Sequence, residues 1–181
     1  MSEFEDLVDA HYQALYRFGM SLVRDPDLAS DLVQETFCIW AAKGHQLQDR
    51  SKAKTWLFTT LHREFLSHRR RSARFSDEPL DAERTEIVAN EEEADRQMDG
   101  HRALELLSEL EETYRAPVAL FYLQQHSYKQ IAEILDIPIG TVMSRLSRGK
   151  ELLRKRMTTE ASSAPKNILQ LNPGGLQQHH G

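Results

Sequence analysis

Basic side chains gather in two stretches of this 181-residue chain, and both stretches have a helical spacing. The first, Lys52–Arg74, holds seven Lys or Arg residues and one acid, with Trp56, Phe58 and Phe65 set among them. The second, Ser127–Met157, reads SYKQIAEILDIPIGTVMSRLSRGKELLRKRM and becomes strongly basic toward its end. Lys and Arg neutralise phosphates, and exposed aromatic rings can stack on unpaired bases. The two stretches are therefore candidate nucleic-acid surfaces.

The chain shows no pattern of catalytic or metal-binding residues. It has no Gly-rich phosphate loop and no H-E-x-x-H, and its single cysteine excludes a C-x-x-C pair. Its eight histidines are scattered, and acidic pairs are too frequent in so charged a chain to indicate paired catalytic carboxylates. We expect no enzyme activity, no cofactor and no metal. The lone Cys38 fits a reducing cytosol, and we expect it to be a buried free thiol.

The second basic stretch has the pattern of a helix-turn-helix. Ser127 and Gln130 form a capping box at the start of a short helix that ends at Leu135. Asp136–Pro138 supplies the turn, because proline cannot continue the first helix. A longer helix follows over Ile139–Arg156 with an apolar stripe to bury. Its other faces carry small polar and basic side chains: Thr141, Ser144, Arg145, Arg148, Lys150, Arg154, Lys155 and Arg156. The alternative interpretation is an ordinary surface helical hairpin with a basic face.

Three helices are predicted before residue 76. Residues 4–22 place apolar side chains on one helical stripe. Asp25 and Pro26 mark the start of a second helix that reaches about Ala42, and a third begins at Ala53 and contains the first basic stretch. The second helix has an acidic face made of Asp27, Asp31, Gln34 and Glu35. This face is either solvated or a docking surface for a basic partner, and spacing alone does not choose between the two.

The middle of the chain has a different composition. Residues 76–99 hold ten Asp or Glu and two Arg with little periodicity, which predicts a flexible acidic linker. Helical spacing resumes with leucines at 104, 107 and 110 and continues over Thr113–Leu123, whereas the composition beyond Met157 predicts a disordered tail. The expected fold is all-α. Two small helical domains, at 1–75 and 100–157, are joined by the linker at 76–99 and followed by the tail at 158–181.

The overall composition is that of an ordinary globular protein. Hydrophobic residues make up 40% of the chain and charged residues 28%, and the formal net charge is −5. No run approaches the roughly 18 apolar residues of a membrane span, and the acidic N-terminus is not a signal peptide. We expect a cytoplasmic protein without membrane insertion.

Three segments carry a resemblance to a known family: DPDLASDLVQETFCIWA, KTWLFTTLHREFLSHRRR and SYKQIAEILDIPIGTVMSRLSRGKELLRK. The patterns D-x-x-Q-E-T-F and G-T-V-x-S-R-L-x-R-G are specific in combination. With them the chain resembles the sigma-70 family of bacterial RNA polymerase specificity subunits. It is most similar to the extracytoplasmic-function (ECF) group, whose short members keep only conserved regions 2 and 4.

The resemblance implies a subunit that binds core RNA polymerase and directs transcription initiation. The acidic helix would dock on the clamp helices of the largest polymerase subunit through Asp31, Gln34 and Glu35. The promoter's −10 element would be recognised and melted by residues of the first basic stretch: Lys52, Lys54, Arg63, Arg69, Arg70 and Arg71. The −35 element would be read as duplex by residues of the helix-turn-helix: Thr141, Ser144, Arg145 and Arg148.

Further partners follow from the same resemblance. They are promoter DNA, the flap of the second-largest polymerase subunit, and an anti-sigma factor that clamps both domains. Arg63 stands where many relatives carry Asn, and Asp136 occupies a turn position often filled by Gly. The competing hypothesis is a free-standing helix-turn-helix regulator, which would not need the D-x-x-Q-E-T-F face. A nuclease that uses acidic residues and a metal is a third.

Overall fold

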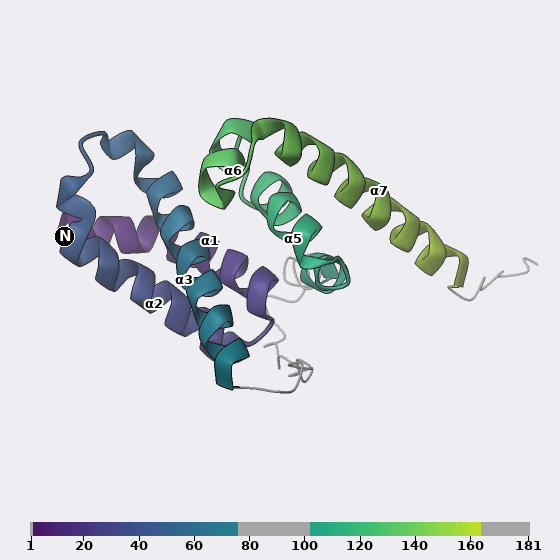
Figure 1. The fold of residues 1–181 in the computed structure, drawn as a ribbon, viewed down its shortest axis with the longest axis horizontal. Coiled ribbons are helices and arrows are strands. Elements are labelled where there is room, and N and C mark those ends of the chain that lie inside the picture. Colours follow the sequence, from purple (N-terminus) through teal and green to yellow (C-terminus); the bar gives the residue numbers. More distant parts are fainter. Residues whose placement is uncertain (1, 76–101, 164–181) are drawn as a thin grey trace, which may run out of the picture.

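The fold is built from helices without a strand in the part of the chain that the computed structural model describes, residues 2–75 and 102–163 (Figure 1). The predicted all-α class is confirmed. The predicted linker at 76–99 and the predicted tail from residue 164 onward lie outside the described residues.

Two long helices open the chain, and each begins at a side-chain cap. In front of α1 (Glu3–Val23), the Ser2 hydroxyl accepts the N–H of Glu5, and the Glu5 carboxylate accepts the N–H of Ser2. In front of α2 (Pro26–Lys43), the Asp25 carboxylate accepts two N–H groups of the first turn, at 2.9 and 3.3 Å. The caps satisfy N–H groups that have no partner within the helix, so both helices start where the sequence predicts.

A third long helix, α3 (Ala53–Phe75), completes the first domain after two short 3₁₀ turns, η1 (Gly44–Gln46) and η2 (Arg50–Lys52). The Trp40 and Trp56 rings meet edge to face with their centroids 5.0 Å apart. Side chains from all three helices form the core, and several are completely enclosed: Leu15, Phe18, Val33, Leu57, Phe58 and Leu61. This packing fixes the direction of α3, which carries the first basic stretch.

The second domain begins with a helix at residues 102–108, followed by α5 (Glu112–Val118) and a π-helical turn, η4 (Ala119–Leu123). The Arg115 guanidinium ties the first two helices together by donating hydrogen bonds to three backbone carbonyls. These carbonyls belong to Leu107, Ser108 and Leu110, at 3.2, 3.2 and 2.7 Å. An arginine in this position satisfies carbonyls at a helix C-terminus, which otherwise lack donors.

The predicted helix-turn-helix is present as α6 (Tyr128–Leu135) and α7 (Ile139–Ser163). Ser127 and Gln130 form the expected capping box, with bonds of 2.9 and 3.2 Å. Helix α7 continues past Arg156, so the predicted tail is wrong for residues 158–163. The physical reason is that no residue that breaks helices occurs before Pro165.

Helix α7 lies close against α5 at Gly149. A Cβ atom on Gly149 would stand 2.6 Å from Cγ2 of Val118, which is closer than packed carbon atoms approach. Because glycine has no side chain, the α7 backbone rests directly on α5 at this point. The apolar stripe of α7 supplies Val142 and Leu146 to the core, as the sequence predicts.

The two domains pack against each other (Figure 1). Helices α1 and α3 of the first domain contact α5, η4 and α6 of the second. Buried apolar side chains of both domains form one continuous cluster. The sequence predicts two domains but does not indicate this contact.

Cys38 is exposed on α2, so the prediction of a buried thiol is wrong. The buried positions of α2 are Ala29, Leu32, Val33, Thr36, Phe37 and Trp40. A period of 3.6 residues places residue 38 on the opposite side of the helix, one turn beyond Gln34. Cys38 therefore lies on the acidic face.

Candidate nucleic-acid interface

The predicted −35 readers lie along the first half of α7. Thr141, Ser144, Arg145 and Arg148 are spaced so that they share one side of the helix. Ser144 and Arg148 are exposed, whereas Thr141 and Arg145 are half-buried. This side of α7 therefore offers one exposed arginine and a second that is partly covered.

The turn before α7 is held on both sides by backbone hydrogen bonds. Asp136 takes a left-handed conformation with φ 53°, which aspartate tolerates better than most residues. The N–H of Ile137 donates to the carbonyl of Ala132 at 3.1 Å, and the Pro138 carbonyl accepts two N–H groups of α7 at 3.0 and 3.1 Å. These bonds fix the angle at which α7 leaves α6, and so the direction in which the readers project.

Arg148 is oriented by an acidic neighbour. Its Nη1 atom lies 3.0 Å from a carboxylate oxygen of Glu151, and Lys155 Nζ lies 3.3 Å from the other oxygen. Hydrogen bonds from Lys155 and Arg148 lower the pKa of the Glu151 carboxyl. Glu151 is therefore ionised at neutral pH, and it holds the Arg148 guanidinium along the helix surface.

The six residues predicted to act at the −10 element divide into two groups. Five of them are exposed: Lys52, Arg63, Arg69, Arg70 and Arg71. Arg69 and the half-buried Lys54 contact the second domain. Lys54 Nζ donates a hydrogen bond to the backbone carbonyl of Gln124 at 3.1 Å, and Arg69 forms an ion pair with Glu112. The structure thus brings the six to one helix and its approach, but not to one common face.

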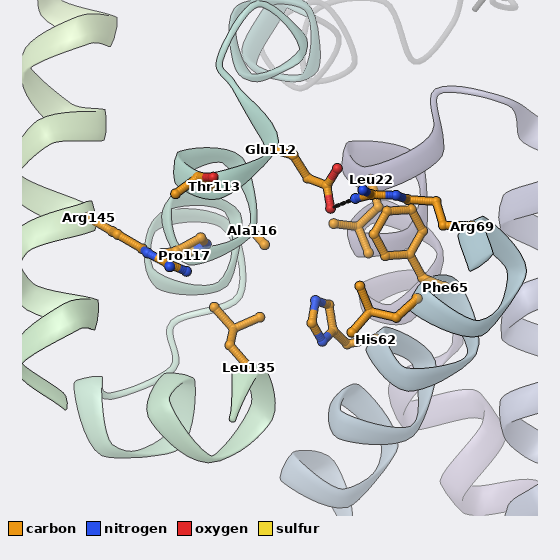
Figure 2. Close-up of a pocket in the computed structure, with 11 residues that line it drawn as sticks. Leu22, His62, Phe65, Arg69, Glu112, Thr113, Ala116, Pro117, Leu135 and Arg145 are labelled. Atoms are coloured by element: carbon orange, nitrogen blue, oxygen red, sulfur yellow. Dashed lines mark ion pairs between the residues drawn. The ribbon is translucent and has the colours of Figure 1, made fainter. Parts of the chain in front are cut away.

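A cavity of about 290 Å³ lies between the two domains (Figure 2). His62, Phe65 and Arg69 line it from α3, and Glu112 faces them from the second domain. Arg145 reaches the same cavity from α7. A predicted −10 residue and a predicted −35 reader therefore line one space.

Two histidines are buried where the domains meet. The ring of His126 is 2% exposed and stands edge-on to Phe58 with the centroids 4.6 Å apart. Its Nε2 atom has no hydrogen-bond partner among the described residues. Burial, with a smaller contribution from the Lys54 charge, lowers the pKa of His126 to about 4, and burial lowers the pKa of His62 to about 4. Both rings are therefore neutral at pH 7.

The residues predicted to dock on polymerase are together on one face of α2. Asp31, Gln34 and Glu35 are all exposed, and in the described ranges their side chains make no hydrogen bond or ion pair. Their backbone positions are fixed because the opposite side of α2 is buried in the core. This face can offer two carboxylates and an amide to a partner without breaking an existing contact.

Sequence reasoning missed the residues that cover α3: Glu112, Gln124 and His126. An acid, an amide and a histidine of the second domain match no motif, and their partners lie far away in the sequence. One signal was present for His126, which directly precedes the N-cap Ser127. At this position, N′, an apolar side chain often packs against the fourth residue of the same helix, which favours a side chain that is not fully exposed.

Two further features concern only residues 2–75 and 102–163. Groups of three or more His, Cys, Asp or Glu that could hold a metal ion are absent there. Within the same ranges no helix has the length and apolar composition that crossing a membrane requires.

Comparison with known proteins gives matches to both halves of the chain. Residues 7–75 match the family model of sigma-70 region 2, and residues 101–153 match that of sigma-70 region 4. The ECF RNA polymerase sigma factor SigL of Mycobacterium tuberculosis (strain ATCC 25618 / H37Rv) is 32% identical over 151 residues, which cover 82% of this chain and 85% of SigL. The ECF sigma factor SigM of Bacillus subtilis (strain 168) is 28% identical over 156 residues, with 83% and 92% covered.

Solved structures agree with these matches. The sigma factor RpoE from Bartonella quintana, in complex with the anti-sigma factor NepR, has a TM-score of 0.74 and 29% identity, covering 88% of this chain and 99% of that one. CnrH, in complex with the cytosolic domain of CnrY, has a TM-score of 0.63 at 19% identity and supports the fold alone.

The chain belongs to the ECF group of the sigma-70 family, as its motifs predict. Proteins of this family are transcription initiation factors rather than enzymes. The chain is thus a promoter-directing subunit of RNA polymerase, and the alternative of a free-standing regulator is not favoured.

Proposed function

We propose that the exposed acidic face of α2 is the polymerase-docking surface of this sigma factor. Asp31, Gln34 and Glu35 would contact the clamp helices of the largest subunit. The proposal rests on their exposure, on their free side chains and on a charge opposite to that of a basic partner. Charge complementarity of this kind sets the register and the rate of association more than the final affinity.

Helix α3 is the proposed surface for the −10 element. Lys52, Arg63, Arg70 and Arg71 are already exposed and would hold the separated strand by its phosphates. Lys54 and Arg69 join them when they leave their present partners in the second domain. This arrangement gives affinity through charge, while base identity is read elsewhere on the same domain.

Helix α7 is the proposed reader of the −35 element. Arg148 and Ser144 are exposed, and Thr141 and Arg145 complete the same side of the helix. A bidentate contact between an arginine and a guanine is worth about 1–3 kcal/mol of discrimination against the wrong base. Most of the sequence preference would therefore depend on Arg148.

An apolar groove on the other half of α7 is the proposed site for the flap of the second-largest subunit. Tyr122, Leu153 and Met157 line it, with the aliphatic stems of Lys150 and Arg154 at its rim, and it encloses about 620 Å³. Tyr122 and Met157 are 49% and 56% exposed, which is unusual for large apolar side chains. An exposed apolar patch with a basic rim is typical of a protein-binding surface.

Three further assignments complete the proposal. The functional units are residues 1–75 and 100–157, the protein acts in the cytoplasm, and it has an anti-sigma factor as a regulatory partner. The last assignment is supported by the Bartonella quintana sigma factor, which was solved with its anti-sigma factor NepR.

The observation that carries the proposal is the presence of two separate basic helices, α3 and α7, together with an uncommitted acidic face on α2. The test is transcription in vitro with purified core polymerase and a promoter library, with and without the protein. We expect initiation at a defined set of promoters only when the protein is present. Initiation that does not depend on the protein, or a lack of core binding, would contradict the proposal.

A further inference from the structure

The loop between α2 and α3, residues 44–52, is shaped by its own side chains. The Asp49 carboxylate accepts a hydrogen bond from the N–H of Ser51 at 3.0 Å and another from the Ser51 hydroxyl at 2.6 Å. The N–H of Lys52 donates to the Asp49 carbonyl at 3.1 Å, which closes the turn η2. The end of the loop is therefore ordered by contacts within the loop itself.

Arg50 ties this loop to the two helices before it. Its Nη1 atom donates a hydrogen bond to the Gly44 carbonyl at 3.2 Å, and its Nε atom lies 3.4 Å from the Glu3 carboxylate at the start of α1. The guanidinium carbon lies over the Trp40 ring of α2, 5.7 Å from its centroid, which is within the range of a cation–π contact. One side chain thus connects the end of the loop to its beginning, to α1 and to α2.

Trp40 gives Arg50 a fixed surface to pack on. The indole is 7% exposed, and its ring meets Trp56 of α3 edge to face with the centroids 5.0 Å apart. Gly44 packs on the same indole, because a Cβ atom at this position would stand 2.6 Å from two carbons of the ring. The backbone at the start of the loop therefore rests directly on the ring that Arg50 covers.

The loop offers polar side chains to a partner on both sides of Arg50. Gln48 is exposed, and it carries an amide, a group that forms paired hydrogen bonds with a base edge. Lys52 is exposed and belongs to the set proposed for the −10 element. Each lies two residues from Arg50 along the chain, so the positions of both depend on how the loop is held.

We propose that Arg50 is a positioning residue for the −10 element, which holds the loop in the shape in which Gln48 and Lys52 meet the DNA strand. Its guanidinium is already engaged by a carboxylate, a carbonyl and an indole face. A loop that is held in its binding shape loses less conformational freedom on binding, and a side chain at a fixed position discriminates better between base edges. The proposal rests on the proposed role of α3 and its approach at the −10 element.

A direct contact between Arg50 and a DNA phosphate is the competing explanation, because this side chain is a cation and is 49% exposed. The salt dependence of binding separates the two. Each phosphate contact contributes about 0.7–0.9 to the slope of log K against log salt concentration. Loss of a positioning residue leaves that slope unchanged, whereas loss of Lys52, a proposed phosphate contact, reduces it.

The first test measures the loop in the free protein by the exchange of amide protons with water, followed by NMR. Arg50→Ala is compared with Arg17→Ala, which removes an exposed arginine of α1. We expect the N–H groups of Ser51 and Lys52 to exchange about two- to tenfold faster in Arg50→Ala only, the range that loss of one such contact gives. Exchange at Leu61, in the buried part of α3, should not change, which shows that the variant is folded.

The second test measures promoter binding by holoenzyme over a range of salt concentrations, with intact and scrambled −10 elements. We expect Arg50→Ala to reduce the preference for the intact −10 element about two- to tenfold and to keep the salt slope of the wild type. Lys52→Ala should reduce the slope by about 0.7–0.9. The preference for an intact −35 element should not change in either variant.

Three results would overturn the proposal: unchanged amide exchange in Arg50→Ala, an equal loss of preference in Arg17→Ala, or a lower salt slope in Arg50→Ala, which would make Arg50 a phosphate contact. A wild-type preference for the intact −10 element that Arg50→Ala keeps would also overturn it, and the proposed function would stand. If the wild type itself shows no such preference, the proposed role of the first domain fails together with that of Arg50.

Discussion

Single side chains on α7 are positioned before DNA is bound. The Arg148 guanidinium is 3.0 Å from Glu151, and both side chains are about half exposed. An exposed pair of this kind contributes at most about 1 kcal/mol, so Arg148 can leave Glu151 for a base at little cost. The pair thus limits where the guanidinium points without preventing its use.

Replacing Arg148 by alanine should weaken recognition of the −35 element. We expect holoenzyme to bind a promoter with an intact −35 element about 5- to 160-fold more weakly, since a bidentate contact is worth about 1–3 kcal/mol. Affinity for core polymerase should not change. Electrophoretic mobility shift with intact and scrambled −35 elements measures this. The control Lys43→Ala removes an exposed cation at the end of α2, and an equal loss there would show that only net charge matters.

Acidification should open the contact between the domains. His62 and His126 have a pKa of about 4 while the domains are in contact and an ordinary value near 6.5 when solvated. The state with the domains apart therefore binds more protons below about pH 6.5. Above that pH, the two neutral histidines contribute fully to the stability of the contact between the domains. This contribution falls by up to about 1.4 kcal/mol per pH unit for each histidine as the pH drops toward 4.

Scattering at pH 7.5 and pH 5.5 measures this effect. The radius of gyration should rise at pH 5.5 in the wild type and rise less in His126→Gln. His45→Gln, which removes an exposed imidazole on η1, serves as the control and should respond like the wild type. An identical rise in His126→Gln would exclude His126 as a cause.

At the scale of helices, local chemistry explains most of the structure. The caps at Asp25 and Ser127 act within three residues of themselves, so the sequence predicts the starts of α2 and α6. The Ser2 cap of α1 acts over the same short range. The end of α7 is not predicted, because a change toward polar composition does not itself terminate a helix. The exposure of Cys38 could have been predicted from the 3.6-residue period applied to its neighbours.

The capping box of α6 should contribute measurably to stability. Ser127→Ala removes the acceptor for the Gln130 N–H, a bond of 3.2 Å. We expect a loss of about 0.5–2 kcal/mol in the free energy of unfolding. Urea denaturation measures this, with Ser147→Ala, an exposed serine of α7, as the control. Equal losses in both variants would mean that the cap is not responsible.

The acidic face of α2 should determine affinity for core polymerase. Reversing charge in the double variant Asp31→Lys and Glu35→Lys is expected to weaken core binding at least tenfold, about 1.4 kcal/mol or more. Binding to DNA by the free chain should not weaken. Fluorescence anisotropy with labelled protein measures the affinity. Asp9→Lys, on an exposed position of α1, is the control, and unchanged affinity in the double variant would exclude this docking surface.

At the scale of the whole molecule, the sequence predicts the helices and the two domains but not the contact between the domains. All of the first basic stretch except Lys52 lies on α3, the helix that the sequence predicts from Ala53. Which of its cations contact the second domain depends on Glu112 and Gln124, which are distant in sequence. Propensity, periodicity and capping act over a few residues and carry no information on such contacts. The sequence therefore predicts which helix carries these side chains but not how accessible each of them is.

Cross-linking the two domains in their packed arrangement should abolish initiation. In a Cys38→Ser background, cysteines at positions 69 and 112 are joined by a reducible bis-maleimide cross-linker. We expect the cross-linked protein to give no promoter-specific transcript with core polymerase, and reduction of the linker to recover the activity of the same uncross-linked variant. Full activity of the cross-linked protein would mean that promoter elements are read without domain separation.

The contact at Gly149 couples the positions of the two ends of α7. The helix is a single rigid rod from Ile139 to Ser163, and it rests on Val118 near its middle, about 15 Å from its first residue. Its first half carries the −35 readers, and its second half borders the groove at Tyr122 and Met157. A side chain at position 149 that tilted the rod by about 10° would move its first residue by about 2.6 Å. The C-terminal end of α7 would move in the opposite direction. The close contact between Gly149 and Val118 therefore determines both the direction of the −35 readers and the shape of the groove.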